Sequence, residues 1–178
     1  TDHDGGITGA NGTVELDLSP RTYEFYAVYR GTTSEKRRVT VTGEETEVIK
    51  IEFRTTEAKV KVQDSNDTPL AGKTVKYKAL GTDFTLGETG ADGIASAELF
   101  AGTYNMWTTV NNTDSGKRPV DITAGTAPDY IDYTFVATLV TMDFPGTIRY
   151  YAGGSNVKFT SPQALFPGTY KFTFSKSG

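Results

Sequence analysis

The segment Thr8-Gly9-Ala10-Asn11-Gly12 returns 81 residues later as Thr89-Gly90-Ala91-Asp92-Gly93. The two copies align without a gap over residues 8–42, and 13 of the 35 aligned pairs are identical. A third, partial copy follows, because Phe100-Ala101-Gly102-Thr103-Tyr104 reappears as Phe166-Pro167-Gly168-Thr169-Tyr170. Periods of roughly 20–50 residues mark solenoids and propellers, whereas about 80 residues suffice for a small domain. The repeat therefore predicts a tandem array of small domains.

The middle copy consists of short alternating segments separated by turn formers. In Ala58-Lys59-Val60-Lys61-Val62, the two valines share one face of an extended chain. Asp92-Gly93 is a strong hairpin signal. Seven short strands and no helix-period segment indicate an all-β sandwich or barrel, and a seven-stranded sandwich is preferred. The predicted strands are 58–62, 74–78, 84–86, 94–100, 103–110, 119–123 and 130–138, and the predicted core aromatics are Tyr77, Phe84, Phe100, Tyr104, Trp107, Tyr133 and Phe135.

The repeat divides the chain into three parts. Residues 60–139 form a complete seven-strand sandwich repeat. Residues 1–59 hold only the late strands of a repeat, and residues 140–178 hold only the early ones. The late strands are predicted at 13–18, 22–29, 38–42 and 46–53, and two of the early ones at 147–151 and 169–174.

Composition excludes several kinds of function. The chain has no cysteine and one histidine, which argues against disulfides, thiol catalysis and most transition-metal sites. Its net charge of −4 and the absence of a basic patch argue against nucleic acid as a partner. No apolar stretch approaches the roughly 18 residues that a bilayer requires, so no membrane insertion is predicted. Threonine is abundant, with 29 residues, and favours strands.

Four segments of the middle copy form one pattern: Val60-x-Val62-x-Asp64, 68–75 (TPLAGKTV), 89–93 (TGADG) and 99–104 (LFAGTY). In these residues the middle copy resembles the transthyretin-like (prealbumin-like) group of extracellular β-sandwich repeats, which includes carboxypeptidase regulatory-like and Cna-B-type domains. The resemblance implies tandem Ig-like or transthyretin-like sandwiches and an extracellular, cell-surface location. Some Cna-B-type domains carry a Lys–Asn isopeptide bond. Here Lys59 and Lys61 are the nearest lysines, but the expected acid is missing and the last strand offers Asp132 in place of Asn. No isopeptide bond is therefore expected.

Candidate metal and cofactor sites are few. Asp64, Asn66 and Asp67 cluster in one turn and could supply hard oxygen ligands to calcium, although the glycine and glutamate positions of an EF-hand are absent. The alternative is an Asx-turn, in which these side chains bond their own backbone, and it is preferred. His3 lies between two aspartates near the terminus and is interpreted as part of a polar end. No metal, cofactor or catalytic residue is predicted.

Two kinds of surface site are candidates for sugar chemistry. Asn11, Asn66 and Asn111 open N-x-[ST] sequons in predicted turns, where a glycan could be tolerated, although a threonine-rich chain forms sequons by chance. Tyr150 and Tyr151 are candidates for a glycan-stacking platform. Because adjacent strand residues face opposite ways, one of these two rings is expected outside the core.

These observations favour a non-enzymatic structural protein of the cell surface, built from tandem sandwiches as a stalk, filament or layer subunit. The expected partner is the chain itself, as a homopolymer or through neighbouring repeats, and surface glycans or host or matrix proteins are further candidates. The partial copies raise the hypothesis that the early strands of 140–178 complement the late strands of 1–59 in a neighbouring copy. A piece of a longer array is the rival explanation. The alternative function is a carbohydrate-binding or adhesin accessory module of a secreted protein.

Overall fold

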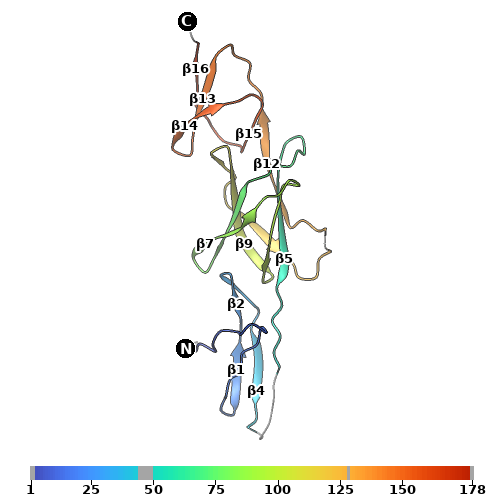
Figure 1. The fold of residues 1–178 in the computed structure, drawn as a ribbon. Helices are drawn as coiled ribbons and strands as arrows, with labels where there is room; N and C mark the ends of the chain where they lie inside the picture. Colours follow the sequence, from blue (N-terminus) through green and yellow to red (C-terminus); the bar gives the residue numbers. More distant parts are fainter. Residues whose placement is uncertain (1–2, 44–49, 128, 177–178) are drawn as a thin grey trace. The chain divides into compact units, whose positions relative to one another are not determined.

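The structure is a computed structural model that describes residues 3–43, 50–127 and 129–176. Every regular element in this part of the chain is a β-strand (Figure 1), so the predicted all-β class is confirmed. None of the described segments is a helix with the length and hydrophobicity needed to cross a lipid bilayer. The chain divides into two compact units: Thr1–Ala27 with Glu35–Phe53, and Val28–Ser34 with Arg54–Gly178.

Among its described residues, the first unit contains one antiparallel pair, β1 (Arg21–Phe25) with β4 (Arg37–Val41). The predicted strand at 13–18 does not form, although polar and apolar residues alternate in its sequence as in a strand. The equivalent strand 81 residues later is β8 (Ile94–Leu99), which pairs with β5 (Thr56–Asp64). No described strand pairs with 13–18, so this segment has no ladder to join. Part of the predicted strand at 46–53 lies outside the described residues.

In the second unit, the central region (residues 54–137) packs two sheets across one hydrophobic core. One sheet has the order β10-β9-β6-β7, with β11 also paired to β9, and the other includes the order β12-β5-β8. All seven strands predicted for the middle copy are present. The remaining strands of this region are β6 (Thr74–Ala79), β7 (Thr82–Glu88), β9 (Gly102–Val110), β10 (Thr113–Asp114), β11 (Arg118–Ile122) and β12 (Tyr133–Val140).

The predicted core aromatics are all buried or packed against the central core, and five of the seven belong to it. Tyr77, Tyr104 and Phe135 are buried within the central core, and Phe84 and Tyr133 pack against it. Phe100 and Trp107 are buried, at 5% and 8% exposed, but neither belongs to the central core cluster. The ammonium of Lys117 lies 4.2 Å from the centre of the Trp107 indole ring. Residues three apart in a strand face opposite sides, so Tyr104 and Trp107 cannot share one face.

The C-terminal region (residues 138–176) has a smaller core of its own. Its three-stranded sheet has the order β14 (Ser155–Phe159), β13 (Thr147–Ala152), β16 (Phe172–Ser175). Tyr150 is fully buried at its centre. The predicted strand at 147–151 is β13, and the one predicted at 169–174 begins later, as β16.

A single strand, β12, serves both regions of the second unit (Figure 1). Tyr133–Ala137 pair in parallel with β5, which closes the central region. The next residues, Thr138–Val140, pair antiparallel with β15 (Gln163–Leu165) in the C-terminal region. The strand changes partners between Ala137 and Thr138 without an intervening loop, so no flexible linker separates the two regions.

Asp132 fixes the chain just before β12. Its backbone N–H donates to the Lys59 carbonyl at 2.9 Å, and its carboxylate accepts from the Lys59 N–H at 2.6 Å. Burial raises the pKa of Asp132, although hydrogen bonds from the backbone partly offset this effect. The carboxylate is thus held in a place that disfavours its charged form.

This burial predicts a pH-dependent difference between the wild type and Asp132→Asn. Because the pKa of Asp132 is higher in the folded state, the protonated carboxyl stabilises the folded wild type at low pH. This contribution to the free energy of unfolding is lost as pH rises from the ordinary pKa of 3.8 through the folded-state pKa. The melting temperature of Asp132→Asn minus that of the wild type should therefore increase across this window and then level off. Asp129→Asn, at a neighbouring exposed carboxylate, is the control and should follow the wild-type profile. A constant difference between Asp132→Asn and the wild type would contradict this account.

Candidate functional site: two equivalent hairpin joints

Two hairpins, 81 residues apart, have the same turn. The first joins β2 (Val28–Tyr29) to β3 (Thr32–Thr33) through Arg30 and Gly31, whose φ angles are 48° and 74°. The second joins β9 to β10 through Asn111 and Asn112, with φ angles of 47° and 63°. Positive φ at both central residues is typical of the two-residue type I′ turn, which matches the natural twist of a hairpin.

The first hairpin is anchored in the central region by a buried threonine. The Thr32 hydroxyl accepts a hydrogen bond from the Phe100 N–H at 3.2 Å and donates to the Tyr29 carbonyl at 2.7 Å. The Tyr77 hydroxyl donates to the Arg30 carbonyl at 2.5 Å. Thr32 is 1% exposed, so its hydroxyl satisfies a backbone donor that water does not reach.

The second hairpin repeats this arrangement in the C-terminal region. The Thr113 hydroxyl accepts from the Phe166 N–H at 2.8 Å and donates to the Val110 carbonyl at 2.7 Å. The Tyr150 hydroxyl donates to the Asn111 carbonyl at 2.5 Å. In each case, a hairpin from one copy of the repeat is held by the same two groups of the next copy, a phenylalanine N–H and a tyrosine hydroxyl. We call these two contacts the first and second joint.

A tyrosine corner supports the receiving residue of each joint. Tyr104 donates its hydroxyl hydrogen bond to the Phe100 carbonyl at 2.8 Å, and Tyr170 donates to the Phe166 carbonyl at 2.5 Å. Each receiving phenylalanine therefore has its carbonyl fixed by the tyrosine four residues later, while its N–H holds the hairpin threonine. The same corner occurs in the first unit, where Tyr23 donates to the Ser19 carbonyl at 2.8 Å.

Burial keeps the joint tyrosines in their donor form. Burial is the largest cause that raises the pKa of both Tyr77 and Tyr150. Both phenols are therefore protonated near neutral pH and can donate to the hairpin carbonyls.

The side chains around the two turns differ. At the first joint, the Arg30 guanidinium donates to the Thr85 carbonyl at 3.2 Å, and a Cβ on Gly31 would overlap the Phe84 ring. At the second joint, the Asn111 side-chain amide donates to the Ala164 carbonyl at 2.9 Å. The joints thus share their backbone and hydroxyl chemistry but have different side-chain contacts.

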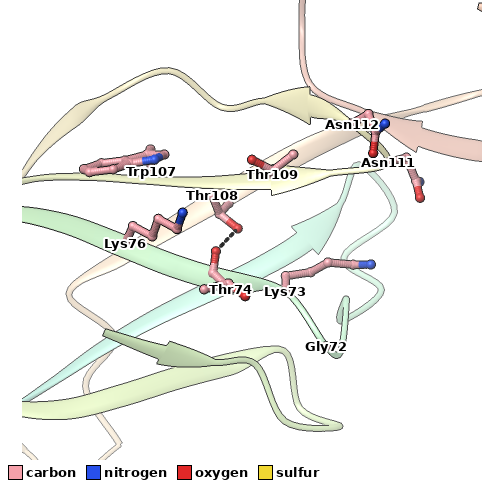
Figure 2. A pocket seen from close by; sticks show the side chains of 9 residues that line it. All are labelled: Gly72, Lys73, Thr74, Lys76, Trp107, Thr108, Thr109, Asn111 and Asn112. Atoms are coloured by element: carbon pink, nitrogen blue, oxygen red, sulfur yellow. Dashed lines mark hydrogen bonds between the residues drawn. The ribbon is translucent and has the colours of Figure 1, made fainter. Parts of the chain in front are cut away.

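A polar groove of 320 Å³ lies beside the second joint, along β6 and β9 (Figure 2). Its floor includes Thr108, whose hydroxyl donates to the Thr74 carbonyl at 2.9 Å. Figure 2 shows Lys76 and Trp107 toward one end and Lys73 with the turn asparagines toward the other. The groove is lined by Gly72, Lys73, Thr74, Lys76, Trp107, Thr108, Thr109, Asn111 and Asn112.

The predicted calcium candidates form hydrogen bonds within their own turn. The Asp64 carboxylate accepts from the N–H groups of Asn66 at 2.8 Å and Thr68 at 3.0 Å. Asp67 accepts from the Gln63 side chain at 2.6 Å. This is the Asx-turn arrangement in which the side chain caps its own loop. Among the described residues, no group of three or more His, Cys, Asp or Glu side chains is placed to hold a metal.

The three sequon asparagines lie in different surroundings. Asn11 and Asn66 are exposed in turns. The side-chain nitrogen of Asn111, the atom that would carry a glycan, donates to Ala164, and the sequon threonine Thr113 is buried in the second joint. A glycan on Asn111 would therefore compete with the joint.

The predicted tyrosine platform is divided between the two faces of β13. Tyr151 is 58% exposed, but Tyr150 is fully buried and belongs to the second joint. Tyr150 therefore cannot stack on a sugar, because alternation along the strand turns it into the core. His3 is exposed.

The comparisons with known proteins add no relative: neither the family models, the curated proteins nor the solved structures contain a match to this chain.

The joints were not predicted from the sequence, although a signal was present. Thr32 and Thr113 are one of the identical pairs at the 81-residue spacing, and Phe100 and Phe166 begin the segment that recurs in the third copy. A threonine in a two-residue hairpin is common, however, and nothing in its surroundings predicts a buried hydroxyl.

The second joint predicts a specific effect of removing one hydroxyl. Thr113→Val leaves the buried Phe166 N–H without a partner, which should cost about 1–3 kcal/mol. Hydrogen exchange of the Phe166 amide should accelerate, whereas Thr113→Ser should retain slow exchange. Thr109→Val, on the exposed face of β9, is the matched control and should leave this amide unchanged. An equally slow Phe166 amide in Thr113→Val would show that the hydroxyl does not hold it.

Proposed function

We propose that this chain is a non-enzymatic structural segment of a cell-surface protein, in which tandem transthyretin-like or Ig-like sandwiches build a stalk, filament or layer. The observation that carries the proposal is the duplicated joint: the hydroxyl of Thr32 or Thr113 meets the N–H of the next receiving phenylalanine. A contact that recurs at each step of a repeat is the means by which such arrays extend. The extracellular location rests on the resemblance of the middle copy to surface repeats.

The shared strand also supports a mechanical role. Because β12 belongs to both sheets, a pull along the chain would act on hydrogen-bonded strand rather than on a loop. The second joint supplies a further connection between the same two regions, through Thr113 and Tyr150. Two connections constrain neighbouring repeats more than one does, which suits a spacer or stalk.

Exposed strand-forming surface supports self-assembly as part of this proposal. Val14, Leu16 and Leu18 are 44%, 42% and 36% exposed, whereas the equivalent positions within Ala95–Leu99 are buried against β5. In the C-terminal region, β16 pairs with β13, and the described residues provide no second partner strand comparable to β11 beside β9. The early strands of one copy would complement the late strands of the next, by strand addition. Both segments contain a Thr-Tyr corner, Thr22-Tyr23 and Thr169-Tyr170, with a strand at or after it, so the two segments overlap and one of these strands must be displaced.

The proposal predicts concentration-dependent oligomers that grow head to tail. Light scattering after size-exclusion chromatography should show increasing mass with concentration, and electron microscopy should show open chains. Leu16→Lys places a charge on the exposed apolar segment and should reduce assembly. Leu80→Lys, at a position 70% exposed in a turn of the central region, is the control and should not. A monomer at every concentration would contradict assembly by strand complementation.

The alternative function, a carbohydrate-binding or adhesin accessory module, is favoured by a different observation. The groove beside the second joint combines lysines, hydroxyls, amides and Trp107. This lining differs from the predicted platform of Tyr150 and Tyr151, which loses Tyr150 to the core.

A further inference from the structure

The groove on the outer face of the central region has a structural cause. Val75 and Lys76 pair with Thr108 and Trp107, so β6 and β9 lie side by side there. This pairing of β6 with β9 ends at Val75 and Thr108, and the groove lies beside that end. On its other edge, toward β7, the backbone before Thr74 is held by three hydrogen bonds: Gly72 N–H to Thr89 carbonyl at 2.8 Å, Lys73 N–H to Thr89 hydroxyl at 2.8 Å, and Thr89 N–H to Lys73 carbonyl at 3.0 Å. These bonds fix the backbone that carries Lys73 at the groove.

The groove carries positive charge on a chain whose net charge is −4. Within the part of the chain that the structure describes, neither Lys73 nor Lys76 makes an ion pair. The Lys117 ammonium lies over Trp107 beside them, 3.7 Å from the Asp83 carboxylate. The Glu88 carboxylate approaches Gly72 at the rim. The two groove lysines are thus available to anionic groups from outside.

The spacing and lining of the groove select the kind of anion. Lys73 and Lys76 are three residues apart, or about 10 Å of extended chain. The two side chains lie toward opposite ends of the groove (Figure 2), so a chain with repeated negative charges can engage both ammonium groups as they stand. Along the same groove, Thr74, Thr109 and Asn112 provide hydroxyl and amide groups, which suit the hydroxyls of a sugar.

We propose that this groove binds an acidic polysaccharide, whose carboxylates pair with Lys73 and Lys76 while its hydroxyls bond Thr74, Thr109 and Asn112. The proposal goes beyond the structural role and does not depend on self-assembly. It adds a site for a carboxylated glycan to the surface of the array.

Calorimetric titration of the full chain with short oligogalacturonate tests this site. Binding should be saturable at millimolar ligand, should weaken with added salt, and should be absent for a neutral cello-oligosaccharide. Lys73→Gln with Lys76→Gln should weaken binding by about tenfold or more, because two charge-assisted contacts are lost. Lys78→Gln with Lys158→Gln removes two exposed lysines outside the groove and should leave affinity within about twofold.

Trp107 provides a second readout, since it is the single tryptophan and lines the groove. Its fluorescence should change with oligogalacturonate in the wild type and in the control variant, but not in the groove variant. Three results would overturn the proposal: no saturable binding, equal affinity in the groove variant, or equally tight binding of polyglutamate, which would indicate an unselective cationic patch. A groove variant with the wild-type melting temperature excludes misfolding as the cause of lost binding.

Discussion

The hydrogen bond between a buried threonine hydroxyl and the backbone N–H of a phenylalanine is the contact on which the joining of the repeats depends. Each phenylalanine lies just after a strand ends, and the hydroxyl of a tyrosine four residues later binds its carbonyl. Its N–H is buried and has no partner in a β-ladder. A buried donor of this kind must be satisfied, and the hairpin threonine of the preceding copy does so in both joints. The buried N–H of each receiving copy is thus satisfied by a side chain of the preceding copy rather than by a strand of its own.

This dependence explains how the chain divides into compact units. Val28–Ser34 lies between two segments of the first unit in the sequence, yet it belongs to the second unit, where Thr32 and Arg30 are bound. The strand predicted at 22–29 is divided into β1 and β2 at the same place. The part before the break belongs to the first unit, and the hairpin after it is bound in the second unit. At the second joint, β9 continues directly into its hairpin, and β12 provides a second connection.

The sequence predicts the strands well because alternation and turn residues are local signals. All seven strands of the middle copy follow from them, and so does the burial of Tyr77 and Phe135. Contacts between copies are less predictable. The segment at 13–18 has a strand pattern but no partner strand among the described residues. Trp107 is buried but lies outside the central core cluster, on the face opposite Tyr104. The groove lies where the pairing of β6 with β9 ends, and the bonds from Gly72 and Lys73 to Thr89 that hold this backbone are contacts that no local pattern encodes.

A double-mutant cycle across the second joint tests the central claim most directly. Thr113→Val and Tyr150→Phe each remove one hydroxyl that holds the same hairpin, from opposite sides of the contact. If the hairpin and its receiving region form one cooperative contact, the unfolding free energies of the two variants should be non-additive by about 0.5–2 kcal/mol. The equivalent pair at the first joint, Thr32→Val and Tyr77→Phe, should give coupling of the same sign. Strict additivity at both joints would contradict the account.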